Sequence, residues 1–239
     1  MTDTPVTLIT GGGSGIGAAT ARQLLEKGQR VAIVGRGQER LDRFAKEVGE
    51  PDGLLTLQGD AGDWDFVQSA VSATLERFGR LDAAVANAGY ATHDGISDGD
   101  PAGWKDMVLS NVLGPALLIR AALSALKETK GRIVFVGSVA GHAFGADNIY
   151  GITKWAITGL AENTRRHVTT EGVGVTLVSP GRTDTPFWED WVEHFGGEKS
   201  ELGLLLTPDQ VADSIVYALS QPYGVDVNTI IIRPLGQPA

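Results

Sequence analysis

Three side chains that could move a proton at a carbonyl oxygen lie close together in this sequence. Ser138 ends an apolar run, and Tyr150 and Lys154 follow it at a spacing of four residues, which places both side chains on one face of a helix. An ammonium beside a phenol favours the phenolate, so we expect Lys154 to lower the pKa of Tyr150 from its ordinary value of about 10. With Ser138 donating to a substrate oxygen, the three predict carbonyl-to-alcohol chemistry. Taken alone, a tyrosine and a lysine at this spacing are also an ordinary surface pair.

A glycine-rich turn near the N-terminus is suited to hold phosphate groups. The run Thr10-Gly-Gly-Gly-Ser-Gly-Ile-Gly17 separates an apolar run from a helical pattern. In that context glycines let the backbone approach a pyrophosphate at a helix N-terminus, although they also suit a merely tight turn. No Gly-Lys-Ser/Thr follows, which excludes a Walker loop. The residues that we expect to bind the nucleotide are Gly11, Gly13, Ser14, Gly15, Ile16 and Gly17.

The end of the second apolar run indicates which dinucleotide is bound. An acidic residue at this place would hold the adenosine ribose hydroxyls of NAD. This chain instead has Gly35-Arg36-Gly37, and Arg36 can pair with a 2′-phosphate. We therefore expect NADP(H) to be preferred. The neighbouring Glu39 and Arg40 leave NAD(H) open, and a solvated surface arginine is the alternative reading of Arg36.

Strand-length apolar runs alternate with helix-period segments along the chain. The strand-like runs cover residues 6–10, 30–35, 54–59, 81–86, 132–137, 173–179 and 228–232. The helical segments include 39–48, 63–78, 101–127, 150–168 and 207–220, the last opened by Thr207 and Pro208 as cap and first residue. Runs that are apolar throughout predict strands buried on both faces, hence a parallel sheet between helical layers.

The sequence therefore predicts a Rossmann-type, doubly wound α/β fold with a seven-stranded parallel sheet in a three-layer α/β/α sandwich. An eight-fold barrel is the runner-up, and seven strands are one too few for it. We expect one dinucleotide-binding and catalytic domain over residues 1–239. A substrate-side excursion is expected at about 182–206, because an irregular segment of that length is usually a functional lid or disordered.

The composition excludes several classes of function. The absence of cysteine excludes disulfides, thiolate metal sites and a cysteine nucleophile. The net charge of −9 argues against nucleic-acid and anionic-membrane partners, which need a basic face. We find no apolar run near the roughly 18 residues that a membrane span needs, and no secretory signal pattern. These observations predict a cytoplasmic protein.

The order of these motifs resembles the short-chain dehydrogenase/reductase family over nearly the whole chain, from about Val6 to Pro234. The family's motifs correspond to the turn Thr10–Gly17, to Asp60, to Asn87-Ala88-Gly89, to Asn111, to Ser138, Tyr150 and Lys154, and to Pro180-Gly181 followed by Thr183 and Thr185. The interval from Ser138 to Tyr150 is one residue shorter than is usual in the family. This departure concerns the substrate-side loop at 142–148.

The resemblance implies a role for each of these residues. Tyr150 would be the general acid or base, Ser138 would polarise the carbonyl, and Lys154 would hold the nicotinamide ribose. Asn111 would support a water relay. Besides Tyr150 and Lys154, the implied contacts to the dinucleotide include Asp60, Ala61, Asn87, Ala88, Gly89, Pro180, Gly181, Thr183 and Thr185. The resemblance also implies a homodimer or homotetramer, with Trp155 in a helix–helix contact.

The expected function is an NADP-dependent oxidoreductase that interconverts a secondary alcohol and a ketone. The alternative from another class is a dinucleotide-binding sensor without turnover, which has no need of four intact catalytic residues. A dehydratase or epimerase is a weaker alternative, because those enzymes usually need a larger C-terminal domain. The ending at 228–237 is similar to that of family members acting on small polar hydroxy compounds.

The remaining polar and aromatic clusters predict no metal. The four histidines, His93, His142, His167 and His194, share no metal-ligand spacing. Of these, His93 and His142 also fit the mouth of the substrate site. The acidic loop Asp94, Asp98 and Asp100 lacks the EF-hand pattern and reads as a solvated face. Trp188, Trp191 and Phe195 fit an apolar lid over the substrate as well as a core or subunit contact.

Overall fold

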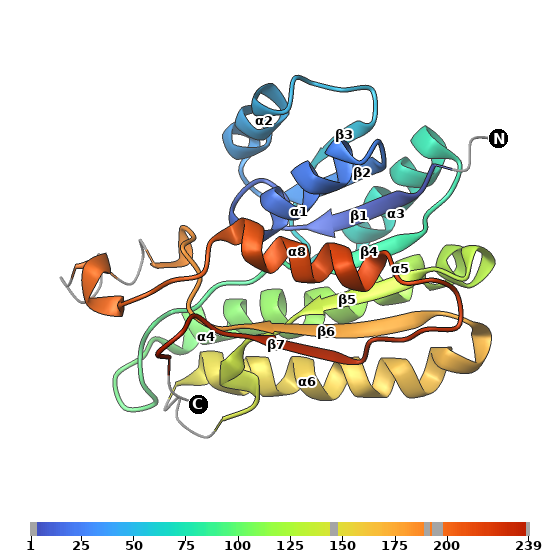
Figure 1. Cartoon of the computed structure of the whole chain (residues 1–239). Helices are drawn as coiled ribbons and strands as arrows, with labels where there is room; N and C mark the ends of the chain where they lie inside the picture. Colours follow the sequence, from blue (N-terminus) through green and yellow to red (C-terminus); the bar gives the residue numbers. More distant parts are fainter. Residues whose placement is uncertain (1–3, 144–147, 189–191, 193–197, 238–239) are drawn as a thin grey trace.

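A seven-stranded parallel sheet runs through the molecule (Figure 1). The computed structural model describes residues 4–143, 148–188, 192 and 198–237. The strands are β1 (Val6–Thr10), β2 (Arg30–Gly35), β3 (Leu54–Gln58), β4 (Ala83–Ala86), β5 (Arg132–Val136), β6 (Gly174–Pro180) and β7 (Thr229–Ile232). They lie in the order β3-β2-β1-β4-β5-β6-β7. The direction of winding reverses between β1 and β4, and ligands of such sheets bind outside the carboxyl ends of the strands at this point.

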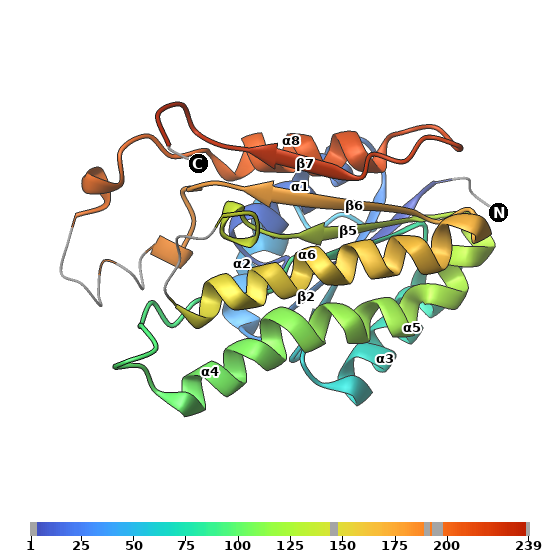
Figure 2. The ribbon, with the colours of Figure 1, turned by 90° about the horizontal axis from the view of Figure 1, so that it is seen from below.

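Helices cover both faces of the sheet, as the view in Figure 2 shows. One face carries α1 (Gly15–Glu26), α2 (Gln38–Glu47) and α8 (Pro208–Leu219), whose apolar side chains share a core cluster with the sheet. The other face carries α3 (Trp64–Phe78), α4 (Pro101–Val108), α5 (Gly114–Thr129) and α6 (Ile149–Val168). The predicted doubly wound α/β/α architecture is therefore confirmed.

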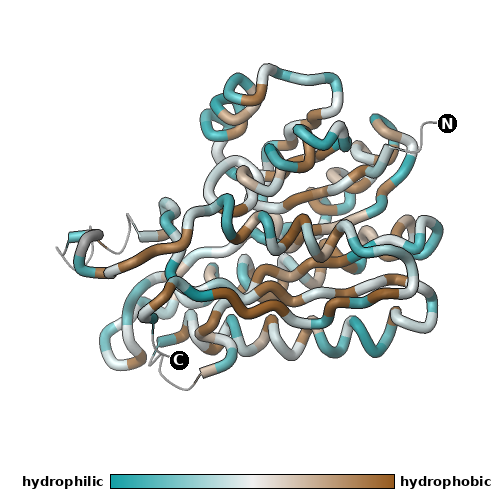
Figure 3. Tube along the Cα trace, viewed as in Figure 1, coloured by the Kyte–Doolittle hydropathy of each residue, from teal (hydrophilic) through white to brown (hydrophobic). Residues whose placement is uncertain are grey.

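The central strands are mostly apolar because each side of the sheet faces a helical layer, and polar residues within them such as Thr7 and Thr176 are buried as well. In β1, Val6 and Leu8 belong to the core under α3 and α5, whereas Ile9 belongs to the core under α1 and α8. In β2, Ala32 and Ile33 alternate in the same way and are fully buried. Figure 3 shows that hydrophobic residues are concentrated in the strands.

One expectation about apolar segments was wrong. The helical stretch Pro101–Thr129 is long and apolar enough to meet the criterion for a candidate membrane span. In this fold its α5 part packs against α3 and β4, with Leu118, Ala122 and Leu126 buried in the core. A core helix passes the same length and composition test, so the apolar character of this stretch has a packing explanation.

The element bounds agree with the sequence pattern to within about two residues, and two local features stand out. Thr207 Oγ1 accepts from Gln210 N at 3.2 Å while Gln210 Oε1 accepts from Thr207 N at 2.9 Å, the reciprocal capping box that opens α8. The helix expected over residues 101–127 instead contains a π-helical turn, Leu109–Leu113, between α4 and α5. π-Helical turns are rare in proteins, and those that do occur often lie at functional sites.

Candidate active site

A cleft of about 800 Å³ opens at the carboxyl ends of the strands, across the point where the winding reverses. Nearly all predicted site residues line it: Gly11, Gly13, Ser14, Gly15, Ile16, Arg36, Asp60, Ala61, Asn87, Ala88, Gly89, Ser138, Tyr150, Lys154, Pro180, Gly181, Thr183 and Thr185. Gly17 and Asn111 were expected here and are not among the lining residues. Both are buried behind the wall of the cleft.

The glycine turn needs its glycines for backbone shape and for close approach. Gly11 and Gly15 have φ of +68° and +54°, a region that other residues rarely adopt. The segment directly after β4 is tied to the start of this turn: Asn87 Nδ2 donates to Thr10 O at 2.9 Å, and Ala88 N donates to Thr10 Oγ1 at 3.2 Å. The open backbone at the start of α1 forms a cradle that fits the pyrophosphate of a dinucleotide.

Gly17 acts through packing, because it lies inside α1 against the turn. A Cβ at this position would lie 2.3 Å from Gly11 O and 2.6 Å from Asn87 Nδ2. We expect Gly17→Ala to lower the free energy of unfolding by about 2 kcal/mol, in the range of overpacking changes. Urea denaturation followed by circular dichroism measures this change.

Gly159 in α6 provides the matched control, because a Cβ there meets nothing within 4 Å. We expect Gly159→Ala to stabilise the protein by roughly 0.5–1 kcal/mol through helix propensity alone. Equal effects of the two substitutions would show that Gly17 has no special packing role.

Ser138, Tyr150 and Lys154 meet at the bottom of the cleft. Ser138 follows β5, and Tyr150 lies in the first turn of α6; both line the cleft. Asn148 caps that helix by accepting from Gly151 N at 3.0 Å. Lys154 lies one turn further, with Nζ 5.6 Å from the Tyr150 ring centroid and donating to Val136 O at 3.2 Å. The shorter interval between Ser138 and Tyr150 therefore leaves the three side chains together.

The direction of the Tyr150 pKa shift differs from our expectation. Burial raises the pKa of Tyr150 to about 12, and the hydrogen bond from Ser138 opposes this rise. Burial also lowers the pKa of Lys154 to about 8. In the unliganded protein, loss of hydration on burial therefore dominates both pKa shifts, and the pKa of Tyr150 rises rather than falls.

Asn111 lies in the π-helical turn and is 1% exposed. Its Oδ1 accepts from Tyr90 N at 3.0 Å, and its Nδ2 donates to Tyr90 O at 2.8 Å and to Thr153 Oγ1 at 3.0 Å. Thr153 in turn donates to Tyr150 O at 2.7 Å. Both N–H bonds of the Asn111 amide are used within the protein, so the side chain joins the end of β4 to the helix that carries Tyr150.

Comparison with known proteins agrees with this geometry. Residues 5–195 match the family model described as short chain dehydrogenase. The chain belongs to the short-chain dehydrogenase/reductase family. This dehydrogenase is 33% identical over 232 residues to an uncharacterized oxidoreductase of Staphylococcus epidermidis, with 96% of this chain and 97% of the relative aligned.

Two solved structures are similar in fold and contain a nicotinamide cofactor. A serine dehydrogenase in its closed form with NADP+ has a TM-score of 0.91 and 28% identity, covering 98% of this chain and 96% of the other. A 3-ketoacyl-(acyl-carrier-protein) reductase from Brucella melitensis with NADH has a TM-score of 0.86 and 26% identity, covering 96% of each. This short-chain dehydrogenase is therefore an oxidoreductase that binds NAD(P).

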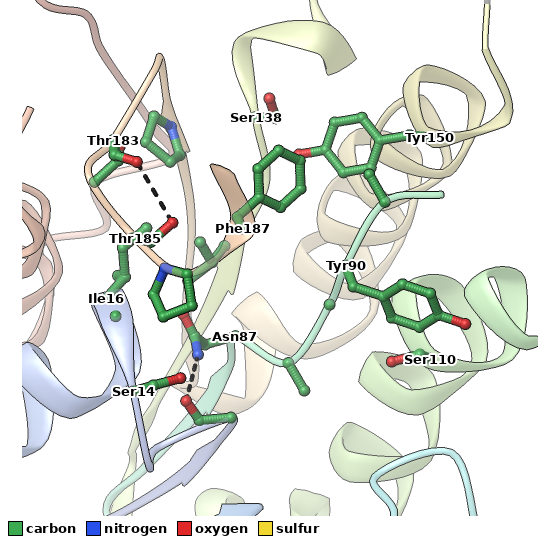
Figure 4. A pocket seen from close by; sticks show the side chains of 18 of the residues that line it. Ser14, Ile16, Asn87, Tyr90, Ser110, Ser138, Tyr150, Thr183, Thr185 and Phe187 are labelled. Carbon is green, nitrogen blue, oxygen red and sulfur yellow. Dashed lines mark hydrogen bonds between the residues drawn. The ribbon is translucent and has the colours of Figure 1, made fainter. Parts of the chain in front are cut away.

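Aromatic side chains form the substrate-side wall of the dehydrogenase (Figure 4). The Phe187 ring lies 5.4 Å from the Tyr150 ring, 4.9 Å from the His93 ring and 5.3 Å from the Trp188 ring, between centroids. His93 Nε2 also lies 3.3 Å from Phe187 O. The sequence pattern indicated His93 and Trp188 but missed Phe187, whose signal is its place two residues after Thr185.

The excursion after β6 starts and ends on one short pairing. Thr183 and Leu206 form an isolated parallel bridge, in which Asp184 N donates to Leu206 O at 2.7 Å and Leu206 N donates to Arg182 O at 2.9 Å. This pairing holds the two described ends of the segment together, with Thr183 in the wall of the cleft. The lid role stays a prediction, and Trp191 and Phe195 lie outside the described residues.

The other clusters of the dehydrogenase show no metal-binding arrangement among the described residues. In the acidic loop, Asp94 accepts from Trp104 Nε1 at 3.0 Å and Asp98 accepts from Gly95 N at 2.9 Å, so both carboxylates bind protein donors. His142 Nε2 lies 2.9 Å from Ser179 Oγ, beside rather than in the wall of the cleft. His167 lies near the end of α6, and His194 is outside the described residues.

Proposed function

We propose that this short-chain dehydrogenase interconverts a secondary alcohol and a ketone with NADP(H), using Tyr150 as the proton donor or acceptor. The observation that carries the proposal is that Ser138, Tyr150 and Lys154 line one dinucleotide-sized cleft, with Lys154 Nζ 5.6 Å from the centroid of the Tyr150 ring. The NADP+ and NADH complexes of similar enzymes support the cofactor class.

We assign each of the three residues a role in the reaction from its position in the cleft. Ser138 would hold the carbonyl oxygen of the substrate beside the Tyr150 hydroxyl, which donates its proton in reduction and accepts one in oxidation. Lys154 would bind the cofactor ribose and keep a positive charge near the phenol. The bound nicotinamide supplies or accepts the hydride.

The Tyr150 phenol is protonated at neutral pH in the unliganded protein, which is the form that donates a proton in reduction. Burial raises its pKa to about 12 and so makes it a weaker acid, a cost that the positive charge of Lys154 would offset in the reacting complex. The Phe187 ring lies 5.4 Å from the Tyr150 ring, between centroids, and covers this side of the phenol.

The cofactor preference depends on Arg36. The Arg36 side chain is exposed at the edge of the cleft, and among the described residues it forms no hydrogen bond or ion pair. We expect Arg36→Asp to weaken NADPH binding by roughly 10- to 100-fold, the value of charge-assisted hydrogen bonds, and to move the preference toward NADH. Fluorescence titration of both cofactors measures the change.

The neighbouring Arg40 also lines the cleft and provides the control. We expect Arg40→Asp to change the ratio of NADPH to NADH affinity much less than Arg36→Asp. A wild-type protein that already prefers NADH strongly would contradict the role assigned to Arg36.

The proposed reaction is tested with a panel of ketones and secondary alcohols. Oxidation or formation of NADPH, followed by its absorbance, is the expected result with at least one member. Tight binding of NADPH with no turnover on the whole panel would favour the alternative, a non-catalytic sensor on the same fold.

We also propose that the dehydrogenase forms a homodimer or homotetramer. Apolar side chains are exposed at the end of α4, in the π-helical turn that follows it and in α6, namely Val108, Leu109, Leu113, Ile152 and Trp155. Exposed apolar groups on neighbouring helices favour association with a second copy.

A further inference from the structure

A tyrosine to which no role has been given contacts the arginine that faces the cofactor end of the cleft. The guanidinium carbon of Arg36 lies over the Tyr90 ring, 5.5 Å from its centroid. Arg36 follows β2 and Tyr90 follows β4, so the pair spans the end of β1, which lies between them in the sheet. Both residues line the cleft.

The backbone of Tyr90 is fixed on both sides. Its N–H donates to Asn111 Oδ1 at 3.0 Å and its carbonyl accepts from Asn111 Nδ2 at 2.8 Å. Figure 4 shows the Tyr90 side chain directed toward Ser110 and away from Tyr150. Tyr90 therefore belongs to the nucleotide end of the cleft rather than to the reaction centre.

Stacking on a ring leaves the arginine able to bind a phosphate. A cation–π contact uses the flat face of the guanidinium, whereas a phosphate binds the N–H groups along its edge. Burial raises the pKa of Tyr90, as does the charge of Asp106, so the phenol stays neutral and leaves the charge of Arg36 uncompensated. The Arg36 guanidinium thus has an aromatic neighbour, while none of its N–H groups forms a hydrogen bond or ion pair among the described residues.

We propose that Tyr90 is a positioning residue that holds the Arg36 guanidinium over the nucleotide end of the cleft, with its N–H edge available to the 2′-phosphate of NADP(H). This inference deepens the proposed cofactor preference and rests on it. An exposed arginine samples many rotamers, and a fixed aromatic platform reduces the entropy that is lost when it binds a ligand.

The test uses two probes that differ in one phosphate, 2′,5′-ADP and 5′-AMP, with affinities measured by calorimetry. We expect Tyr90→Leu to weaken 2′,5′-ADP binding by roughly 2- to 5-fold, the size of an exposed cation–π contact, and to leave 5′-AMP binding within error. Tyr90→Phe keeps the ring and should retain the wild-type affinity for 2′,5′-ADP.

A second pair of variants separates positioning from general damage. In an Arg36→Ala background, Tyr90→Leu should cause no further loss of 2′,5′-ADP affinity, because Tyr90 acts through Arg36. An equal loss with and without Arg36, or an equal loss for both probes, would overturn the inference.

A failure of the proposed NADP preference gives a different result from a failure of the role proposed for Tyr90. If the wild-type protein binds 5′-AMP as tightly as 2′,5′-ADP, the NADP preference itself is wrong. If the wild-type protein prefers 2′,5′-ADP and Tyr90→Leu preserves that preference, the NADP preference stands and the role of Tyr90 is wrong.

Discussion

Replacing Tyr150 with phenylalanine is expected to lower kcat/KM for ketone reduction by roughly 10²- to 10⁴-fold, the usual value of a positioned general acid. The substitution removes one hydroxyl and keeps the ring that packs 5.4 Å from Phe187. The remaining ring should preserve the cleft, so we expect the affinity for NADPH to change little. A loss in rate without a loss in binding is the signature of a group that acts in the transition state.

The measurement compares steady-state reduction of a ketone by the wild type and the Tyr150→Phe variant at several pH values. Tyr223→Phe is the matched control, because Tyr223 is 76% exposed and does not line the cleft. Its kcat/KM should equal that of the wild type. A Tyr150→Phe variant as active as the wild type would remove the phenol from the mechanism and leave Ser138 or water as the proton donor.

The strands could be predicted from the sequence because their burial on two faces leaves a local signal. Val6–Thr10 and Arg30–Gly35 were predicted with the bounds that the structure shows. The cap at Thr207 was also predictable, since the capping box is formed by residues three apart. The π-helical turn at Leu109–Leu113 leaves no such pattern, because its apolar residues also fit a continuous α-helix.

For the site, the sequence was sufficient to predict which residues lie together but not the pKa values and contacts that depend on packing. The spacing of Ser138, Tyr150 and Lys154 predicted that they lie together, and all three line the same cleft. The direction of the Tyr150 pKa shift was predicted wrongly, because it depends on how much water the surrounding chain removes, and that is a property of the packed structure. Phe187 and Tyr90 were missed for the same reason, since their partners lie far away along the chain.

Replacing Lys154 with methionine is expected to reduce activity and to stabilise the fold. Lys154 is 7% exposed, and burial lowers the pKa of its ammonium from 10.5 to about 8. Keeping the ammonium buried at pH 7 therefore costs about 3 kcal/mol. The variant also loses the hydrogen bond from Nζ to Val136 O, worth about 1 kcal/mol. We expect a net gain of about 2 kcal/mol in the free energy of unfolding and a decrease in kcat/KM of roughly 10²-fold or more.

The pH dependence of the difference in free energy of unfolding between Lys154→Met and the wild type shows whether the buried ammonium is the cause of that difference. Between the folded-state pKa of about 8 and the unfolded value of 10.5, the unfolded wild-type chain binds the proton more often than the folded chain does. Raising the pH through this range therefore stabilises the wild type, while the methionine variant lacks this contribution. The advantage of the variant should be largest below pH 8 and should shrink steadily as the pH approaches 10.

Urea denaturation of the cofactor-free proteins at pH 7, 8, 9 and 10 measures this trend, with Lys105→Met as the control for an exposed lysine. The control should stay within about 0.5 kcal/mol of the wild type at each pH. A Lys154→Met advantage that is absent at pH 7, or that grows with pH, would show that the ammonium is not held at a cost. In that case a nearby group must compensate the charge of the Lys154 ammonium.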